Sequence, residues 1–279
     1  MNDKPSPRKM SDEHNTHHAQ KRRERREKAN SGKRQKPSFT RENKSDLLIY
    51  GLHPVRNAIL NPKRTKRVLF ATKNALDRLG LNEDQIAGLK IEEKLPRDLD
   101  RMVGSDAVHQ GAVLDVKPLP NAKMPDLAAH DLLLVLDQVT DPHNVGAMMR
   151  SAVALGAGAI ITTSRYSPTE TGVLAKAASG ALELIPHVEV RNLADALIEL
   201  HENGFESVGL DSEGPQPFET TAVSGKIALV LGSEGKGLRQ KTRDTCTHLA
   251  RLDMPGAIKS LNVSNAAVLA LYISRSKLA

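Results

Sequence analysis

Short apolar runs alternate with amphipathic stretches along the chain from residue 46 onward. A run that is apolar almost throughout, such as LLLVLD at 132–137, is typical of a strand buried on both faces in a parallel sheet. The stretches between these runs have the helical period, with turn residues at their ends. We therefore expect an α/β protein.

The pattern predicts both kinds of element, and we find no internal repeat. The predicted strands are 47–50, 66–71, 89–91, 109–116, 132–137, 159–163, 183–185, 206–210, 227–231 and 249–252. The predicted helices lie within 51–60, 74–81, 97–103, 171–180, 193–203 and 263–277, and one more follows a polar loop at 141–144. Pro54 falls in the first turn of the first helix, where its missing N–H leaves no helical bond unmade.

A proline-rich stretch divides the alternating elements into two groups. LPNAKMPDLAAHD and the residue before it contain three prolines, a composition typical of a linker. We expect a small α/β domain at 46–117, a linker at 118–130 and a larger α/β domain at 131–279. Residues 1–45 have almost no aliphatic side chains, so we expect a disordered tail there.

Charge is concentrated in the tail, which holds 14 Lys/Arg and 6 Asp/Glu, whereas the rest of the chain holds 26 and 27. Such an arm binds phosphates without sequence preference, so we expect an electrostatic tether to RNA. A solubilising or targeting tail is the alternative. His14, His17 and His18 are expected to be solvated rather than metal ligands.

Composition narrows the remaining classes of function. Aromatic residues make up 3% of the chain and Trp is absent, which disfavours an aromatic platform for base stacking. The single Cys246 excludes an internal disulfide and a cysteine metal cluster, which fits the reducing cytoplasm. No apolar run reaches the length of a membrane span. We expect a cytoplasmic protein with neither a metal nor a membrane partner.

Three polar motifs carry the candidate chemistry. The first is NVGAMMR, in which Asn144 is a candidate N-cap and Arg150 follows in the second helical turn. Taken alone, this is also the pattern of a capped helix with a surface arginine. The third is SLNVSNAA, with Ser260, Asn262 and Ser264 at a helix start, where one of them must be a cap.

The second motif is LGSEGKGLR, a glycine-rich loop after an apolar strand. Gly232, Gly235 and Gly237 permit left-handed turns and close approach of a ligand to the backbone. The Lys-Ser/Thr ending of a phosphate loop is absent, and no GxGxxG opens the first βα unit. Glu234 would repel a phosphate but could hold a hydroxyl, an amine or a cation, unless it is a solvated turn residue.

In this order and spacing, DPHNVGAMMRSA, LVLGSEGKGLR and MPGAIKSLNVS resemble the three motifs of the SpoU-type RNA 2'-O-methyltransferases. The similarity covers about residues 46–279 and is greatest to the branch that methylates a guanosine ribose in large-subunit (23S) ribosomal RNA. GLHPVRNAIL and VHQGAV resemble the ends of that branch's ribosomal-protein-like RNA-binding domain. Asp253 stands where the family usually has proline, and the basic tail lies outside the family pattern.

The resemblance implies an α/β-knot (trefoil, SPOUT-type) methyltransferase domain, a homodimer and S-adenosylmethionine as methyl donor. It places Arg150 near the ribose 2'-oxygen, either deprotonated with help from an RNA phosphate or as a cation that stabilises the oxyanion. The residues implied to orient Arg150 and the ribose are Asn144, Glu234, Ser260 and Asn262. Those implied to hold the cofactor are Gly232, Leu252, Met254 and Leu261.

Three other functions compete with methylation of ribosomal RNA. A transfer-RNA ribose methyltransferase has the same chemistry, but relatives of that kind commonly lack the separate N-terminal domain. A non-catalytic RNA-binding or ribosome-assembly factor would have no need for the whole set of Asn144, Arg150, Glu234 and Asn262. A nucleotide hydrolase is disfavoured because the phosphate-loop ending is missing.

Overall fold

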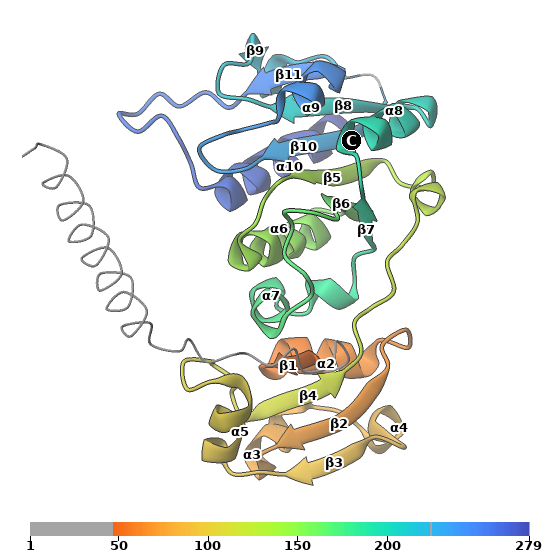
Figure 1. The fold of residues 1–279 in the computed structure, drawn as a ribbon, viewed down its shortest axis with the longest axis vertical. Coiled ribbons are helices and arrows are strands. Elements are labelled where there is room, and N and C mark those ends of the chain that lie inside the picture. Colours follow the sequence, from red (N-terminus) through yellow and green to blue (C-terminus); the bar gives the residue numbers. More distant parts are fainter. Residues whose placement is uncertain (1–46, 224, 279) are drawn as a thin grey trace, which may run out of the picture. The chain divides into compact units, whose positions relative to one another are not determined.

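Two β-sheets organise the computed structural model, which describes residues 47–223 and 225–278 (Figure 1). The expected tail therefore lies outside the described residues. The smaller sheet has the strand order β1-β4-β2-β3, and the larger has the order β7-β6-β5-β10-β8-β11-β9. All described residues belong to one compact unit, so contacts between the two sheets' domains can be described directly.

The smaller sheet is mixed: β4 is antiparallel to β1 and β2, while β2 and β3 are parallel. Its strands are β1 (Leu47–Tyr50), β2 (Lys66–Ala71), β3 (Lys90–Glu93) and β4 (Ala112–Val116). Its helices are α2 (Leu52–Leu60), α3 (Lys73–Leu79), α4 (Glu83–Ile86) and α5 (Pro96–Val103). The Thr72 side chain caps α3 and left-handed Gly80 ends it, so the helix predicted at 74–81 is shorter than expected.

The larger sheet is parallel throughout its described ladders, as the continuous apolar runs predict. Its strands are β5 (Leu132–Asp137), β6 (Ala159–Thr163), β7 (His187–Val190), β8 (Phe205–Leu210), β9 (Gln216–Pro217), β10 (Lys226–Gly232) and β11 (His248–Arg251). Its α-helices are α6 (Pro142–Ala154), α7 (Gly172–Ala178), α8 (Leu193–Glu202), α9 (Gln240–Thr245) and α10 (Val263–Leu278). Short 3₁₀ turns lie at η1 (Met124–Leu127), η2 (Ala181–Glu183) and η3 (Phe218–Thr220).

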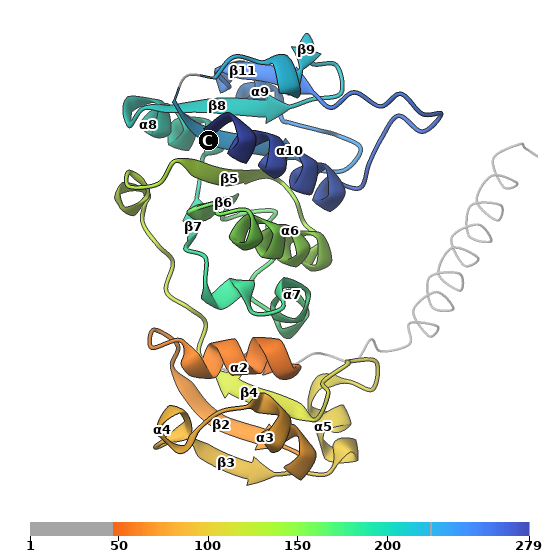
Figure 2. The ribbon, with the colours of Figure 1, turned by 180° about the vertical axis from the view of Figure 1, so that it is seen from behind.

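Helices cover both faces of the larger sheet, which is why its central strands are apolar on both sides (Figures 1 and 2). Leu134 of β5 belongs to the core shared with α6, α7 and α10, whereas Leu133 belongs to the core shared with α8. None of the helices in the described ranges combines the length and apolar character that crossing a bilayer requires.

Helix α7 lies between α6 of the larger domain and β1 of the smaller domain, and at its two glycine contacts there is no space for a side chain. A Cβ added at Gly146 of α6 would lie 2.7 Å from the backbone oxygen of Leu174. A Cβ added at Gly172 of α7 would lie 2.4 Å from the backbone oxygen of Leu48 in β1. Backbone therefore approaches backbone on both sides of this short helix.

The strand predicted at 183–185 is wrong. These residues belong to η2 and the turn that follows it, and the strand begins only at His187, after Pro186. Leu182 and Ile185 are buried in the core from this turn, and Glu183 bonds to another domain. The prediction was wrong because the apolar residues of this turn are buried in the core, which gives the turn the same apolar pattern as a short strand. The pattern also missed α4, β9 and α9.

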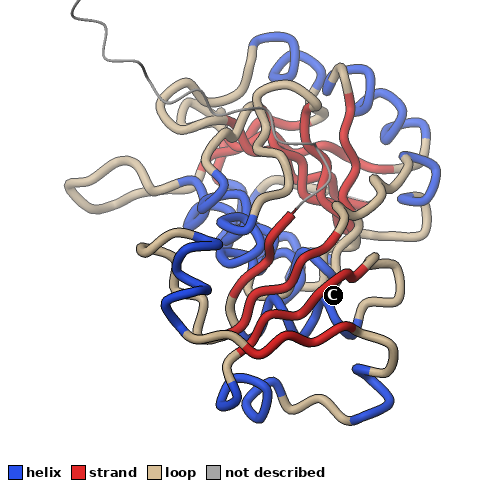
Figure 3. Tube along the Cα trace, turned by 60° about the horizontal axis from the view of Figure 1, so that its bottom comes forward, coloured by secondary structure: helices blue, strands red, loops and turns tan. Residues whose placement is uncertain are grey.

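Because the larger sheet is parallel, the carboxyl ends of its strands meet at one edge. The loops after β5, β6, β8, β10 and β11 all begin at this edge, because these strands run in the same direction. Figure 3 shows the strands of both sheets in red and the loops in tan. We call it the carboxyl edge. All three sequence motifs lie in loops or helix starts that follow this edge.

Candidate active site

Helix α6 begins three residues earlier than expected. Pro142 occupies its first turn, and the N-cap is Asp141, whose carboxylate accepts a bond of 2.9 Å from the backbone N–H of His143. The expectation that Asn144 caps this helix is therefore wrong. Because Asp141 performs the capping, the Asn144 side chain is free to bond to another part of the chain.

Asn144 bonds to Glu234 and Asn262, and the three side chains form a group that we call the Glu234 network. Glu234 Oε1 accepts bonds from Asn144 Nδ2 at 3.0 Å and from Asn262 Nδ2 at 2.7 Å. Asn262 Nδ2 also lies 3.0 Å from Asn144 Oδ1. The network joins the starts of α6 and α10 to the loop after β10, across 118 residues of sequence.

Glu234 is exposed, and all its hydrogen-bond donors in the described chain are neutral. The third of them is the backbone N–H of Val263, at 3.3 Å. No Lys, Arg or His in the described ranges forms an ion pair with Glu234. Its negative charge is therefore not paired with a cation within the described ranges.

The glycine loop, residues 232–237, is closed by its own backbone. Ser233 and Gly237 exchange two backbone hydrogen bonds, of 3.2 and 2.9 Å. A Cβ on Gly232 would lie 2.1 Å from the carbonyl carbon of Gly237, so only glycine fits at the neck of the loop. Gly237 itself has a left-handed backbone, with φ of 65°.

An ion pair between a buried carboxylate and a partly exposed arginine, which the sequence analysis missed, anchors the glycine loop. Asp137, at the end of β5, is fully buried and accepts bonds from the Arg239 backbone N–H at 3.0 Å and from its Nε at 2.6 Å. The signal was present in the sequence, because an acid that ends an otherwise apolar buried strand needs a partner.

The start of α10 shows which residue of the third motif is the cap. Asn262 Oδ1 accepts a bond of 2.9 Å from the Ser264 backbone N–H, so Asn262 caps the helix while its amide nitrogen bonds to Glu234. Asp253, where proline was expected, accepts a bond of 2.8 Å from Arg251 Nε.

A cavity of about 340 Å³ opens beside the glycine loop, and we call it the cofactor cavity. All four residues expected to hold the cofactor line it, together with Glu234 and Ser260. They are Gly232, Leu252, Met254 and Leu261. Leu210, Leu231 and Val263 add apolar walls, while Asp211, Ser212 and Lys259 add polar groups. A mostly apolar cavity with a few polar groups suits a small organic ligand.

Arg150 does not line the cofactor cavity and lies exposed on the third turn of α6, because that helix begins at Pro142. It is one turn beyond Gly146, the residue at which α6 packs against α7. The structure thus brings the side chains of Asn144, Glu234 and Asn262 into contact. Ser260 lines the cofactor cavity together with Glu234, whereas Arg150 lies outside the cavity and is exposed to solvent.

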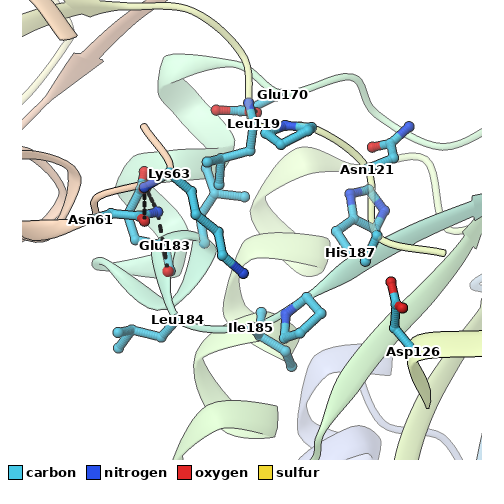
Figure 4. Close-up of a pocket in the computed structure, with 14 residues that line it drawn as sticks. Asn61, Lys63, Leu119, Asn121, Asp126, Glu170, Glu183, Leu184, Ile185 and His187 are labelled. Carbon is cyan, nitrogen blue, oxygen red and sulfur yellow. Dashed lines mark hydrogen bonds between the residues drawn. The ribbon is translucent and has the colours of Figure 1, made fainter. Parts of the chain in front are cut away.

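A second cavity, of about 360 Å³, lies between the two domains (Figure 4). Beside it, Arg64 is fully buried and bonds to the carboxylates of Glu170 and Glu183. Asn61 Nδ2 donates to the same Glu183 at 2.7 Å. We call these four residues the Arg64 cluster. Burial raises the pKa of Glu170, although the Arg64 charge opposes that shift.

The geometry defines a class before any comparison. A parallel α/β sheet that carries a closed glycine loop, a ligand cavity and an uncompensated carboxylate at its carboxyl edge is the framework of a cofactor-dependent enzyme. The SpoU rRNA Methylase family model matches residues 131–272, and the model named RNA 2'-O ribose methyltransferase substrate binding matches residues 48–122. The chain belongs to the SpoU rRNA methylase family.

Curated relatives cover nearly the whole of the described chain. The 23S rRNA (guanosine-2'-O-)-methyltransferase RlmB of Vibrio vulnificus is 39% identical, over 82% of this chain and 96% of its own. The protein of the same name from Pseudomonas putida is 37% identical, over 80% and 94%. The predicted family, its RNA 2'-O-methyltransferase activity and S-adenosylmethionine as donor are confirmed.

Solved structures show the same fold. The SpoU methyltransferase AviRb of Streptomyces viridochromogenes, in complex with AdoMet, has a TM-score of 0.70 at 23% identity, over 84% of this chain and 91% of its own. An AdoMet-bound rRNA methyltransferase of Sinorhizobium meliloti also has a TM-score of 0.70, at 22% identity, over 84% and 88%. The expectation of an α/β methyltransferase fold is confirmed at this level.

Proposed function

We propose that this protein methylates the ribose 2'-hydroxyl of a guanosine in 23S ribosomal RNA. The observation that carries the proposal is the similarity to the 23S rRNA methyltransferases, which covers both domains and more than nine tenths of those relatives. The cytoplasm, where ribosomal RNA is found, is the proposed place of reaction.

The cofactor cavity fits S-adenosylmethionine by its chemistry. Gly232 keeps the loop neck narrow, while Leu252, Met254 and Leu261 offer apolar surface to an adenosine-sized group. When bound, S-adenosylmethionine supplies a methyl group activated by a positively charged sulfur. The unpaired charge of Glu234, on the wall of the same cavity, complements that positive charge.

The protein's own groups must position the ribose and deal with the proton of a weak acid. Arg150 is the proposed catalytic group at the 2'-oxygen. It acts either as proton acceptor, deprotonated with help from an RNA phosphate, or as a cation that stabilises the developing oxyanion. Asn144, Glu234, Ser260 and Asn262 are proposed to orient Arg150 and the ribose, and three of them are already bonded together.

The domain boundaries at 46–117, 118–130 and 131–279 are retained as part of the proposal, with the smaller, ribosomal-protein-like domain holding RNA. The tail at 1–45 is proposed as an electrostatic tether because of its 14 basic residues. Deleting it should weaken RNA affinity and flatten its salt dependence while methyl transfer persists. An unchanged salt slope in filter-binding titrations would refute the tether.

A homodimer and a trefoil knot complete the proposal. Val268, Leu269 and Tyr272 leave 41%, 47% and 65% of their surface exposed on α10, an apolar face suited to a second copy. The knot rests on the resemblance of the three motifs at the carboxyl edge to those of knotted relatives.

The test is to map 2'-O-methyl groups in ribosomal and transfer RNA from cells with and without the gene. We expect one guanosine of 23S ribosomal RNA to lose its methyl group. Loss at a transfer-RNA position instead would assign the same chemistry to a different substrate. Unchanged methylation everywhere would favour a non-catalytic ribosome-assembly factor.

A further inference from the structure

The loop between β6 and α7, residues 164–171, presents an exposed aromatic side chain at the carboxyl edge. Three consecutive residues, Ser164, Arg165 and Tyr166, are exposed, and Tyr166 leaves 65% of its surface to solvent. The chain has only three Tyr and four Phe. Among the described residues, Tyr166 and Tyr272 of α10 are the highly exposed aromatics.

Tyr166 is held in an unfavourable backbone conformation. Its φ is 63°, in the left-handed region that bulky side chains rarely adopt. Hydrogen bonds of the side chain of Thr163, which is buried at the end of β6, hold the residues on both sides of Tyr166. Thr163 Oγ1 donates to the backbone oxygen of Arg165 and lies 3.3 Å from Ser167 Oγ. Strain held in place by buried bonds is common where a side chain must be presented to a ligand.

The other end of the loop is fixed by the neighbouring domain. Glu170 bonds to the buried Arg64. Its second oxygen accepts a bond of 2.9 Å from the backbone N–H of Leu119, and both Glu170 and Leu119 are labelled in Figure 4. Thr171 then caps α7, accepting a bond of 3.2 Å from the Leu174 backbone N–H. The loop is thus anchored at both ends and leaves only its exposed turn available for a ligand.

Strand order places this turn between the cofactor cavity and the smaller domain. The cavity is lined from β8, β10 and the segment after β11, and β5, which precedes Asn144, is next in the sheet. β6 follows β5, with Leu136 paired to Thr162. Helix α7, after the turn, touches β1 of the smaller domain. RNA that is held by that domain and has a ribose at α6 would therefore come near the turn.

We propose that Tyr166 stacks on a base of the RNA substrate that flanks the methylated nucleotide, with Arg165 beside it against the phosphate backbone. The proposal rests on the proposed RNA methyltransferase function and makes Tyr166 a substrate-binding residue of that reaction. One stacked base agrees with the low aromatic content, which excludes an extended platform but not a single contact.

Three variants of the full chain test the proposal. Tyr166→Phe keeps the ring, Tyr166→Gly removes it and also suits the left-handed backbone, and Ile198→Ala removes an exposed apolar side chain from α8. Each is measured for melting temperature, S-adenosylmethionine affinity, and kcat and KM with 23S ribosomal RNA. For Tyr166→Gly we expect an equal or higher melting temperature and unchanged cofactor affinity, but roughly a tenfold rise in KM for RNA.

Tyr166→Phe and Ile198→Ala should match the unchanged protein in KM. If Tyr166→Gly has a normal KM for RNA, or if Tyr166→Phe is as impaired as Tyr166→Gly, the stacking role is overturned. Failure of the proposed function gives a different result, because the unchanged protein would then transfer no methyl group to 23S ribosomal RNA.

Discussion

Two arginines, Arg150 and Arg64, differ in almost every physical respect. Arg64 is fully buried between the domains and bonds to Glu170, Glu183 and the backbone oxygen of Lys117. Arg150 is exposed on α6, and no carboxylate in the described ranges forms an ion pair with it. The same guanidinium is therefore a structural element in one place and an unpaired cation in the other.

The carboxylates repeat this contrast. Glu183 is neutralised by a buried cation, whereas Glu234 is exposed and bonded only to amides. Buried charges must be paired, because removing them from water is costly. Groups that await a ligand remain near solvent, where an unpaired charge is tolerated. We infer that partner and burial together separate the structural charges of this chain from the functional ones.

The largest expected effect is on catalysis, from Arg150→Ala. Because Arg150 is exposed, the variant should fold normally and bind S-adenosylmethionine with unchanged affinity. Methyl transfer should fall by about 10²- to 10⁴-fold, the range for loss of a proton-transfer group. Single-turnover transfer of labelled methyl groups measures this, with the exposed Arg191→Ala as control. Normal transfer by Arg150→Ala would remove its catalytic role.

Arg64→Ala should have the opposite profile. It leaves Glu170 and Glu183 as buried carboxylates without a cation, which costs about 3–5 kcal/mol of unfolding free energy. Urea denaturation measures the loss. The triple variant Arg64→Met, Glu170→Gln, Glu183→Gln should be more stable than Arg64→Ala, because all three side chains at the site are then neutral. A stability unaffected by Arg64→Ala would contradict the structural role.

Glu234→Gln tests the charge of the open site with little change in shape. The amide can still accept bonds from Asn144 and Asn262, but the negative charge is lost. We expect S-adenosylmethionine affinity to fall by roughly tenfold, in keeping with about 1–2 kcal/mol for a charge-assisted contact. Calorimetric titration measures it, and S-adenosylhomocysteine, which lacks the positive sulfur, is the control ligand. An equal loss for both ligands would exclude a charge effect.

The smallest effect concerns His187, which is half-buried and bonds through Nε2 to Thr162 Oγ1 at 2.8 Å. Burial lowers its pKa, so the unfolded chain binds a proton first as the pH falls below about 6.5. Stability should therefore decline below that pH, and less steeply in His187→Gln. Melting temperatures at pH 7.5 and 5.5 measure the difference, with exposed His53→Gln as control. Equal slopes for His187→Gln and the unchanged chain would contradict it.

Sequence reasoning succeeded where the cause is local. The strand at 132–137 was predicted because both its faces are apolar, and Pro54 marked the first turn of α2. One local signal was overlooked, because Asp141 directly before Pro142 is the pattern of an N-cap followed by proline at the first helical position, yet Asn144 was taken for the cap. Sequence reasoning also failed where a distant partner decides. The pairs of Arg64 with Glu183 and of Asp137 with Arg239 join residues 119 and 102 positions apart.

The family motifs supplied more of the site than any local rule did. Asn144, Glu234 and Asn262 were grouped through the resemblance, and the structure brings their side chains into contact. The roles of all five residues stay predictions, and among the described residues no hydrogen bond joins Arg150 or Ser260 to the network.

The two backbone contacts of α7 have a mechanical consequence. Since Gly146 and Gly172 leave no clearance on either side of this helix, the thickness of one helical backbone sets the spacing between the RNA-holding domain and the arginine-bearing helix. Because this spacing is set by backbone contacts, side-chain substitutions at other positions of α7 do not change it. Substitutions on the exposed surfaces of either domain therefore leave the spacing between the smaller domain and α6 unchanged.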